Sequence, residues 1–306
     1  MTKNGNSASS DECEAPRRMM LPRTIGRVGV LRLATRALAT RLPIVGGNWK
    51  CNPKSAAELP ELIANINSCD TAGCEVYVCP SPLHVALVQG KLTNGAVVAP
   101  QNCNFTGCGA YTGEMAVEQM KSMGISWVLI GHSERRGEFG LPTPAESSAL
   151  LATKCKHAYE NGFKVVYAIG EPLPVREKGI SAVIAHCVEQ LKPFKEMKLL
   201  DPDKIVLAYE PVWSIGTGVT ASPKQAQETH AALRAWLAKE VSKDTADRMR
   251  IQYGGSANAK NAPELSACPD VDGFLVGGAS LKAEFKDIVS AVAKAKGQKR
   301  PMAKGV

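Results

Sequence analysis

Residues 205–218 read IVLAYEPVWSIGTG, and they begin with a short apolar run of a kind that recurs along the chain. The apolar run Ile205–Ala208 is rich in β-formers and too short for a helix, so it predicts a buried strand that leads to the acid Glu210. The segment behind it, 211–218, combines a stiff proline, apolar side chains and two glycines, which suits a loop that covers a site. These residues indicate either a base under a cover or a solvated carboxylate beside an ordinary apolar turn.

Short apolar runs like this one alternate with longer amphipathic stretches. The predicted strands are residues 44–48, 75–79, 96–99, 127–130, 164–169, 204–209, 250–252 and 272–275. The predicted helices are residues 55–67, 82–89, 115–123, 144–161, 174–192, 223–241, 259–265 and 281–296. Eight strand-then-helix units in about 250 residues predict an α/β fold of the TIM (β/α)8 barrel type, with its chemistry at the carboxyl ends of the strands. A doubly wound open sheet is the competing architecture, but no G-x-G-x-x-G follows the first strand.

The composition divides the chain into an N-terminal extension (1–43), a single barrel domain (44–296) and a basic C-terminal tail (297–306). Residues 1–14 are polar, and we expect them to be disordered. Residues 15–43 contain seven arginines and no acid, which is typical of an organellar transit peptide for a mitochondrion or plastid. An extension without a targeting role, in a cytoplasmic protein, is the alternative.

The formal net charge of +8 is concentrated at the two ends of the chain. Residues 1–43 hold eight Lys or Arg against three acids, and residues 291–306 hold five Lys or Arg and no acid, so the body between them has a net charge of −2. A nearly neutral body is not typical of a nucleic-acid-binding domain. No apolar run reaches the roughly 18 to 20 residues that cross a bilayer. We therefore expect neither nucleic acid nor a membrane as a partner.

The chain has ten cysteines, but they form no C-x-x-C pair and no H-x3-5-H sequence accompanies them. Disulfide frameworks are typical of short secreted chains rather than of a domain of this size. We expect small, buried thiols in a reducing compartment and no metal site.

Chemically competent side chains follow several of the predicted strands. Asn48 and Lys50 follow the first in GGNWKCN, His132 and Glu134 follow the fourth in GHSERR, and Glu210 closes the sixth. Singly, each has an ordinary explanation, because most lysines are solvated and a lone histidine is more often a packing residue. Together they place a carboxylate, an imidazole and an ammonium at the end of the barrel where this fold carries its chemistry.

Glycine-rich turns follow the last two predicted strands, where (β/α)8 barrels most often bind phosphate. Gly277 and Gly278 lie in LVGGASL, and Ser256 follows the glycines of YGGSA, so backbone N–H groups and a hydroxyl can approach a dianion. We also expect residues 279–281 to begin a helix whose N-terminal dipole favours an anion. No G-x-x-x-x-G-K-[ST] sequence is present, so ATP binding is not predicted.

A carboxylate base, an imidazole and an ammonium around a phosphate-anchored small molecule suit proton transfer at a carbon next to a carbonyl. The carboxylate takes the proton, and the other two groups stabilise the oxygens of the enediolate. This chemistry requires no redox cofactor and no metal. Two other interpretations stay open: an aldolase that uses Lys50 as a Schiff-base nucleophile, and an inactive barrel that serves as a binding protein.

Seven motifs carry a resemblance to a known family. They are GGNWKCN, GAYTGE, GHSERR, AIGE, YEPVWSIGTG, YGGSA and DGFLVGGASL. In their content and order the chain resembles the triosephosphate isomerase family. The resemblance implies a cofactor-free enzyme, usually a homodimer, that interconverts dihydroxyacetone phosphate and D-glyceraldehyde 3-phosphate in glycolysis and gluconeogenesis.

The resemblance also implies a role for each matching residue. Glu210 corresponds to the catalytic base, His132 to the electrophile, and Lys50 to the catalytic and substrate-binding cation. Asn48 lies beside that cation, and Glu134 supports it. The implied phosphate-binding residues are Gly216, Ser256, Gly277 and Gly278, and the implied closing loop is Pro211, Val212, Trp213, Ser214, Ile215, Gly216, Thr217 and Gly218. A neutral histidine and the closure of the loop are features of the family and do not follow from these residues alone.

The same resemblance implies that residues 103–114 insert into a partner subunit, with Thr112 near the partner's active site. An ordinary surface loop is the alternative. Two features depart from the family's pattern: Ala168 stands where many members have cysteine, and residues 137–147 form a longer stretch than usual.

Overall fold

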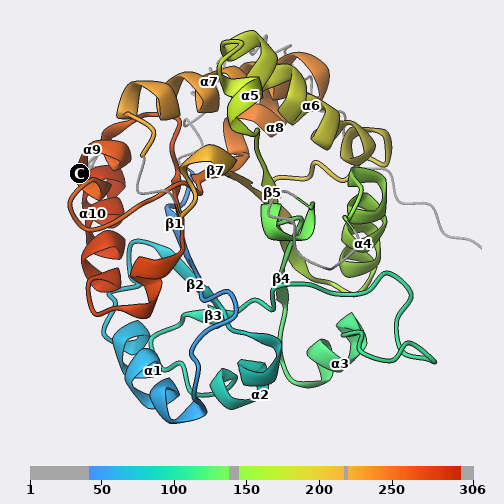
Figure 1. Ribbon diagram of the computed structural model, residues 1–306, viewed down its shortest axis with the longest axis vertical. Helices are drawn as coiled ribbons and strands as arrows, with labels where there is room; N and C mark the ends of the chain where they lie inside the picture. Colours follow the sequence, from blue (N-terminus) through green and yellow to red (C-terminus); the bar gives the residue numbers. More distant parts are fainter. Residues whose placement is uncertain (1–40, 138–144, 217–219, 298–306) are drawn as a thin grey trace, which may run out of the picture. The chain divides into compact units, whose positions relative to one another are not determined.

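A computed structural model describes residues 41–137, 145–216 and 220–297 of the chain. In these residues, parallel strands surround a central axis and helices lie outside them (Figure 1). The strands are β1 (Ile44–Asn48), β2 (Glu75–Cys79), β3 (Val97–Val98), β4 (Trp127–Ile130), β5 (Lys164–Ile169), β6 (Ile205–Tyr209), β7 (Arg250–Tyr253) and β8 (Gly273–Val276). The expected (β/α)8 barrel is confirmed.

The helices follow the strands in the order that the alternation predicts. The α-helices are α1 (Leu59–Asn67), α2 (Val85–Val88), α3 (Val117–Ser122), α4 (Ser148–Glu160), α5 (Leu173–Arg176), α6 (Ile180–Glu196), α7 (Pro223–Glu240), α8 (Lys243–Arg248), α9 (Ala262–Ala267) and α10 (Phe285–Gly297). The short 3-10 helices are η1 (Ala56–Glu58), η2 (Pro82–His84), η3 (Ser133–Arg135), η4 (Val212–Ser214) and η5 (Gly278–Leu281).

The strand order β3-β2-β1-β8-β7-β6-β5-β4 makes the first and last strands neighbours. Val45 of β1 pairs with Phe274 of β8. The two outermost strands in this order, β3 and β4, meet through a bond from the Leu129 N–H to the carbonyl of Pro100, at 2.8 Å. This contact closes the ring, and because the paired strands are parallel, their carboxyl ends face the same opening.

Alternate residues of each strand enter two different cores. Ile44, Leu129 and Val206 belong to the cluster inside the barrel, whereas their neighbours Val45 and Val128 belong to the larger cluster between strands and helices. This period of two is the ordinary alternation of side chains along a strand. It also sets which way a residue just beyond each strand points.

The inside of the barrel is closely packed around Tyr77. A Cβ added to Gly46 would lie 2.0 Å from Cζ of Tyr77, so only glycine leaves room for this ring. The Tyr77 hydroxyl donates to Oε1 of Gln252 at 2.7 Å, and Nε2 of Gln252 donates to the carbonyl of Phe274 at 2.7 Å. The buried polar side chains of Tyr77 and Gln252 are therefore paired with each other and with the backbone, as a core requires.

The expected helices were wrong in three places. The single helix expected at 174–192 is split into α5 and α6 at Gly179, whose φ of +92° is left-handed and cannot continue a helix. The helix α8 was not predicted, although Ser242 caps it by accepting from the Thr245 N–H. Residues 279–281 lie in the single 3-10 turn η5, and the long helix α10 begins only at Phe285.

The predicted boundary of the barrel at residue 43 stays a prediction, and the extension and the C-terminal tail lie almost wholly outside the described residues. Arg41, just before β1, donates from Nε to Oδ1 of Asp272 at 2.6 Å. It also donates to the carbonyl of Pro269 at 3.0 Å. Arg41 therefore contacts the barrel although it lies before the predicted boundary.

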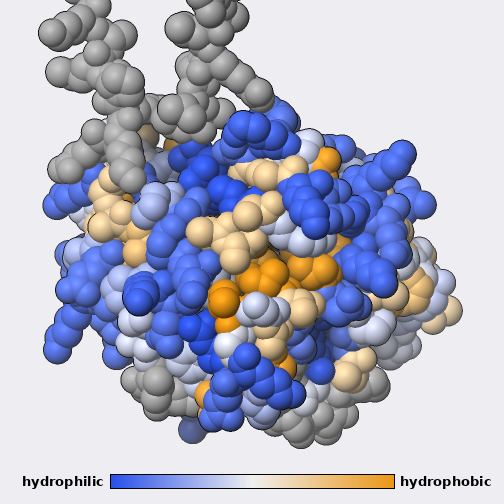
Figure 2. Space-filling model, turned by 90° about the horizontal axis from the view of Figure 1, so that it is seen from above, coloured by the Kyte–Doolittle hydropathy of each residue, from blue (hydrophilic) through white to orange (hydrophobic). Residues whose placement is uncertain are grey.

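Figure 2 shows the side of the molecule on which α5 to α8 lie in Figure 1, and hydrophilic residues cover most of it around a smaller hydrophobic area. Three exposed large hydrophobic residues belong to these elements or their caps: Leu173, Met197 and Val241. Among the described residues, no helix combines the length and the apolar character needed to cross a membrane.

The fit of Tyr77 over Gly46 leads to a stability prediction. We expect Gly46→Ala to lower the free energy of unfolding by about 2 kcal/mol or more, because overpacking of a rigid core costs about 1–3 kcal/mol. Chemical denaturation measures it. Gly73→Ala is the matched control, since a Cβ there would lie 3.6 Å from Cβ of Ala293, an ordinary contact. Equal losses in the two variants would contradict the packing argument.

Candidate active site

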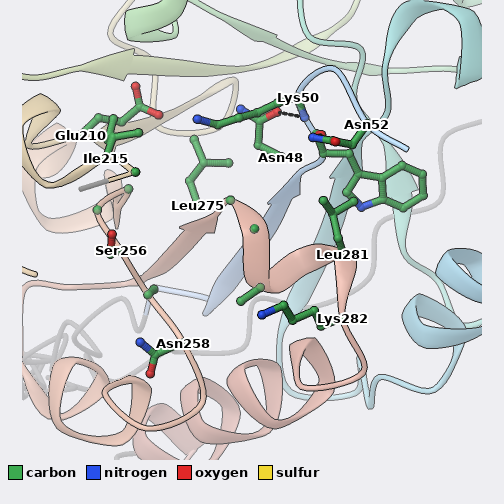
Figure 3. A pocket seen from close by; sticks show the side chains of 18 of the residues that line it. Asn48, Lys50, Asn52, Glu210, Ile215, Ser256, Asn258, Leu275, Leu281 and Lys282 are labelled. Carbon is green, nitrogen blue, oxygen red and sulfur yellow. Dashed lines mark hydrogen bonds between the residues drawn. The ribbon is translucent and has the colours of Figure 1, made fainter. Parts of the chain in front are cut away.

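A cavity of about 390 Å³ opens at the carboxyl ends of the strands. Residues that the sequence singled out line it: Asn48, Lys50, His132, Glu210, Gly216, Ser256, Gly277 and Gly278. Figure 3 shows Glu210 and Lys50 on opposite sides of the space above Leu275, with the side chain of Lys50 extending toward Glu210. Residues far apart in the sequence thus share one pocket, as the strand-end pattern predicts.

Glu210 is the most enclosed of the charged groups in this cavity. Ala208, two residues earlier, belongs to the cluster inside the barrel, so the alternation along β6 turns Glu210 inward as well. The residue is only 2% exposed. A Cβ at Gly254 would lie 2.6 Å from Cγ of Glu210, and one at Gly170 would lie 1.7 Å from its carbonyl oxygen. Two glycines on the neighbouring strands therefore make the room that Glu210 occupies.

His132 faces this carboxylate from the turn after β4. Its Nε2 lies 3.2 Å from Oε1 of Glu210. Its Nδ1 accepts a bond from the backbone N–H of Glu134 at 3.2 Å, which makes His132 the cap of η3. Because Nδ1 acts as an acceptor, the ring proton of the neutral imidazole is on Nε2. This is the nitrogen that points into the cavity.

Lys50 is held from both its backbone and its side chain. Its φ of +52° lies in the left-handed region, which is unusual for a residue other than glycine. Its N–H donates to Oδ1 of Asn48 at 3.0 Å, and its carbonyl accepts from Nε2 of Gln101 at 2.7 Å. Its Nζ is 2.7 Å from Oε1 of Glu134. The ammonium therefore enters the cavity with a carboxylate behind it.

Burial and nearby charges act on Glu210 in opposite directions. Burial raises its pKa above the ordinary value, and it is the largest of the effects. His132, the Ser133 N–H, which donates to Oε2 of Glu210 at 3.4 Å, and Lys50 act the other way. The balance is a raised pKa, which strengthens Glu210 as a base.

The opposite wall of the cavity consists of glycine-rich turns. A Cβ at Gly216 or Gly278 would meet no atom within 4 Å, so both glycines border open space. We expected residues 279–281 to begin a helix whose dipole favours an anion. This prediction is wrong, because η5 is a single 3-10 turn and carries little dipole. The backbone N–H groups of these turns are the features that suit an anion. The hydroxyl of Ser256 donates to the Ser214 carbonyl at 2.7 Å and so ties this wall to the loop after β6.

The loop after β6 is attached through Glu171, the last residue of AIGE. Trp213 donates from Nε1 to Oε1 of Glu171 at 2.9 Å, and the Tyr209 hydroxyl donates to the same oxygen at 3.0 Å. Burial raises the pKa of Glu171. Residues 211–216 are described and include η4, whereas Thr217 and Gly218 of the predicted closing loop lie outside the described residues.

Of the predicted loop residues that the structure describes, Ile215 and Gly216 line the cavity, and 211–214 do not. Two other predicted residues also lie apart from the cavity wall. Glu134 lies behind Lys50, and Thr112 is an exposed residue in the turn before α3, separate from this pocket. Sequence reasoning gave no role to Glu171 or Gln101. Both follow predicted strands within two residues, so the same strand-end rule could have marked them. Gly170 had no expected role, and Gly254 was expected only as one of the glycines of YGGSA that approach a phosphate. The room that both leave for Glu210 depends on which strands are neighbours.

In residues 41–137, 145–216 and 220–297, no group of three or more His, Cys, Asp or Glu side chains is arranged to bind a metal ion. The thiols of Cys79, Cys103 and Cys187 are buried, and burial raises the pKa of each of them. These cysteines pack as apolar groups and offer no nucleophile to the cavity.

The raised pKa of Glu210 predicts how its replacement alters stability with pH. The folded state holds the proton more tightly than the unfolded chain, so the stability that Glu210 contributes is present below its ordinary pKa of 4.5 and is lost as pH rises through the folded pKa. Glu210→Gln does not titrate. We therefore expect its stability, relative to the parent, to increase with pH from about 4.5 upward and then to level off. Denaturant unfolding at a series of pH values measures this, and a difference that shrinks as pH rises would contradict it.

Comparison with known proteins agrees with this geometry. Residues 43–292 match the sequence profile of the family described as triosephosphate isomerase. A triosephosphate isomerase of Coprinopsis cinerea is 46% identical over 254 residues, which cover 82% of this chain and 98% of that protein. The matched region contains the strands β1 to β8 and every residue that lines the cavity. The chain belongs to the triosephosphate isomerase family.

Proposed function

We propose that the chain interconverts dihydroxyacetone phosphate and D-glyceraldehyde 3-phosphate, as the name of its family and of its relative indicates. The observation that carries the proposal is the enclosed carboxylate of Glu210, 3.2 Å from Nε2 of His132 in the cavity that Lys50 also enters. A base, a neutral hydrogen-bond donor and a cation around one small cavity are what an enediolate intermediate requires.

In the proposed reaction, the phosphate group lies against the backbone N–H groups of Gly216, Gly277 and Gly278. The carbonyl oxygen of the substrate accepts from Nε2 of His132 and lies near the ammonium of Lys50. Glu210 removes a proton from the adjacent carbon, and the electron pair moves to that oxygen to give the enediolate. Nε2 of His132 gives its proton to this oxygen and takes the proton of the neighbouring hydroxyl, which becomes the new carbonyl. As it does so, Glu210 returns the first proton to the neighbouring carbon, so no cofactor is consumed.

The loop at Pro211–Gly218 has a physical purpose in this scheme. An enediolate phosphate in water can expel its phosphate group, and a cover that excludes water protects it. Trp213 ties the loop to Glu171, and Ser256 donates to the carbonyl of the next residue, Ser214. These bonds give the loop defined contacts from which to close.

The aldolase alternative requires Lys50 to be a neutral amine among apolar groups. Its Nζ instead lies 2.7 Å from a carboxylate oxygen of Glu134, an ion pair rather than an apolar environment. The binding-protein alternative leaves the enclosure of Glu210 without a purpose, since burial of an ionisable carboxylate costs stability. Both alternatives are therefore disfavoured by the site itself.

A coupled assay of the parent, Glu210→Asp and Lys50→Ala tests the proposed reaction. We expect Glu210→Asp to lose turnover on the order of 100-fold with a much smaller change in KM, because the shorter side chain withdraws the base from the reacting carbon. Lys50→Ala should raise KM as well as lower kcat. Equal activity in all three proteins would refute the assignment, and irreversible inactivation by borohydride plus substrate would support the aldolase instead.

We also propose that the chain forms a homodimer through the side that carries the turns after β2 and β3. Large hydrophobic side chains are exposed there: Leu83 is 86% exposed, Phe105 45% and Tyr111 47%. Figure 1 shows the segment before α3 projecting away from the barrel. An exposed apolar projection of this kind suits a partner of the same sequence, into which Thr112 would reach.

Sedimentation of the protein at micromolar concentration tests this proposal. We expect the parent to sediment as a dimer, and Tyr111→Asp to shift it toward monomer because a charge would be buried in the interface. Met197→Asp is the control, since Met197 is 38% exposed at the end of α6, away from the turns after β2 and β3. A monomeric parent, or equal effects of the two substitutions, would refute the proposed interface.

The composition of residues 15–43 supports a further proposal, that the N-terminal extension directs the protein to a mitochondrion or plastid. We expect a fluorescent protein fused behind residues 1–43 to enter such an organelle. Replacing the seven arginines of residues 15–43 by glutamine should abolish the import, since these presequences act through their positive charge. A parent fusion that stays diffuse in the cytosol would refute the targeting role.

A further inference from the structure

Arg136, the residue that ends η3, binds the carboxyl ends of two strands at once. Its Nε donates to the carbonyl of Gly131 at 2.7 Å, just after β4. Its Nη2 donates to the carbonyl of Ala168 in β5 at 3.0 Å and to the Tyr167 hydroxyl at 2.8 Å. Its Nη1 donates to Oγ of Ser148, the first residue of α4, at 3.2 Å. One guanidinium therefore joins two strands and a helix.

Arg136 does not line the substrate cavity. Its guanidinium lies 5.3 Å from the centre of the Tyr167 ring, and Tyr167 belongs to the core outside the barrel. Arg136 and Glu210 instead border one gap between the turns after β4 and β6, which is too small to hold a water molecule. The guanidinium therefore lies one layer behind the reacting groups.

The connection to His132 runs through Gly131. Gly131 has a φ of +76°, and a Cβ added to it would lie 2.8 Å from Tyr167 and 3.0 Å from Nη2 of Arg136. The carbonyl that Arg136 binds belongs to the peptide group joining Gly131 to His132. Because that peptide group is fixed, the direction in which His132 leaves the strand is fixed with it.

The connection to Glu210 runs through β5. Arg136 binds the carbonyl of Ala168, and the next carbonyl along, that of Ile169, accepts from the N–H of Glu210 at 2.7 Å. The same guanidinium thus tethers the peptide before His132 and the strand end to which the backbone of Glu210 is bound. These two backbone segments carry the two groups that lie 3.2 Å apart in the cavity.

From these contacts we infer that Arg136 is a positioning residue for the proposed isomerase reaction, holding Nε2 of His132 and the carboxylate of Glu210 at their working separation. This inference rests on the proposed function. Lysine can keep the charge but cannot reach both carbonyls with a planar fork, and methionine can pack on Tyr167 but cannot donate. Both replacements should therefore loosen His132 relative to Glu210.

Arg234 provides a matched control at the other end of the barrel. Its guanidinium binds the Asp270 and Asp272 carboxylates at 2.8 and 2.9 Å and the carbonyls of Ala246 and Met249 at 2.6 and 2.8 Å. It is thus as heavily bonded as Arg136, but it ties the amino ends of strands, away from the cavity. Loss of either arginine should lower stability, and only loss of Arg136 should act on turnover.

The experiment compares Arg136→Met, Arg136→Lys and Arg234→Met in kcat, KM and thermal midpoint. We expect both Arg136 variants to lose kcat on the order of 10- to 100-fold with KM nearly unchanged, since a small misplacement of a catalytic group costs that much. Arg234→Met should lower the thermal midpoint at least as far while keeping kcat within about 2-fold of the parent.

A chemical rescue tests the same inference with Arg136→Ala, which leaves space for a free guanidinium ion. Guanidinium chloride, far below denaturing concentrations, should restore part of the kcat of Arg136→Ala and none of that of Glu210→Asp.

A readout independent of activity accompanies these assays. This readout is nitrogen NMR of protein with 15N-labelled histidine, in which the His132 signals are assigned as those lost in His132→Gln. In the parent we expect the His132 ring to be protonated at Nε2. In Arg136→Met its signals should shift or show exchange. An inactive parent would refute the proposed function. An active parent whose Arg136 variants keep kcat, or lose it no more than Arg234→Met, would overturn the inference, and so would an unchanged His132 signal.

Discussion

The enclosure of the Glu210 carboxylate is the constraint on which the rest of the site depends. A charge that is 2% exposed is costly unless polar groups surround it, so His132, the Ser133 N–H and Lys50 must all reach the same side of the barrel. Room must exist too, and Gly170 and Gly254 supply it on the two adjacent strands. The register of β5 and β7 against β6 is therefore a functional requirement as well as a structural one.

Strand alternation separates the two buried acids at this end of the barrel. Glu210 follows an outward-facing Tyr209 and turns inward, whereas Glu171 follows an inward-facing position and turns outward, where it accepts from Tyr209 and Trp213. The first acid meets the substrate cavity and the second meets the loop that covers it. A shift of one residue in either strand would exchange these directions, so the chemistry and its cover depend on the same pairing of β5 with β6.

The strands were the most predictable part of the fold, because short apolar runs between turn signals leave few alternatives. Glu210, His132 and Lys50 could be selected from the sequence alone as strand-end groups, and the resemblance gave them roles. The split at Gly179 was missed because glycine within a helical pattern is ambiguous until its φ is known. The contacts of Arg136 and the room that Gly170 and Gly254 leave for Glu210 were missed for a different reason: the partners are distant in sequence, and only the lateral order of the strands brings them together.

The amino end of the barrel stabilises the fold, and the carboxyl end carries the reacting groups. At the amino end, Asp272 accepts from Arg41, Arg234 and the Ile251 N–H, so charge pairs and backbone bonds reinforce one another. At the carboxyl end the structure contains features that cost free energy: a left-handed Lys50, worth about 1 kcal/mol or more of strain, and an enclosed carboxylate. Such features persist only where the surrounding bonds hold them in place. The bond from Nε2 of Gln101 to the Lys50 carbonyl is one of these bonds. The stable end of the barrel thus allows the other end to hold its reacting groups in conformations that none of them would adopt alone.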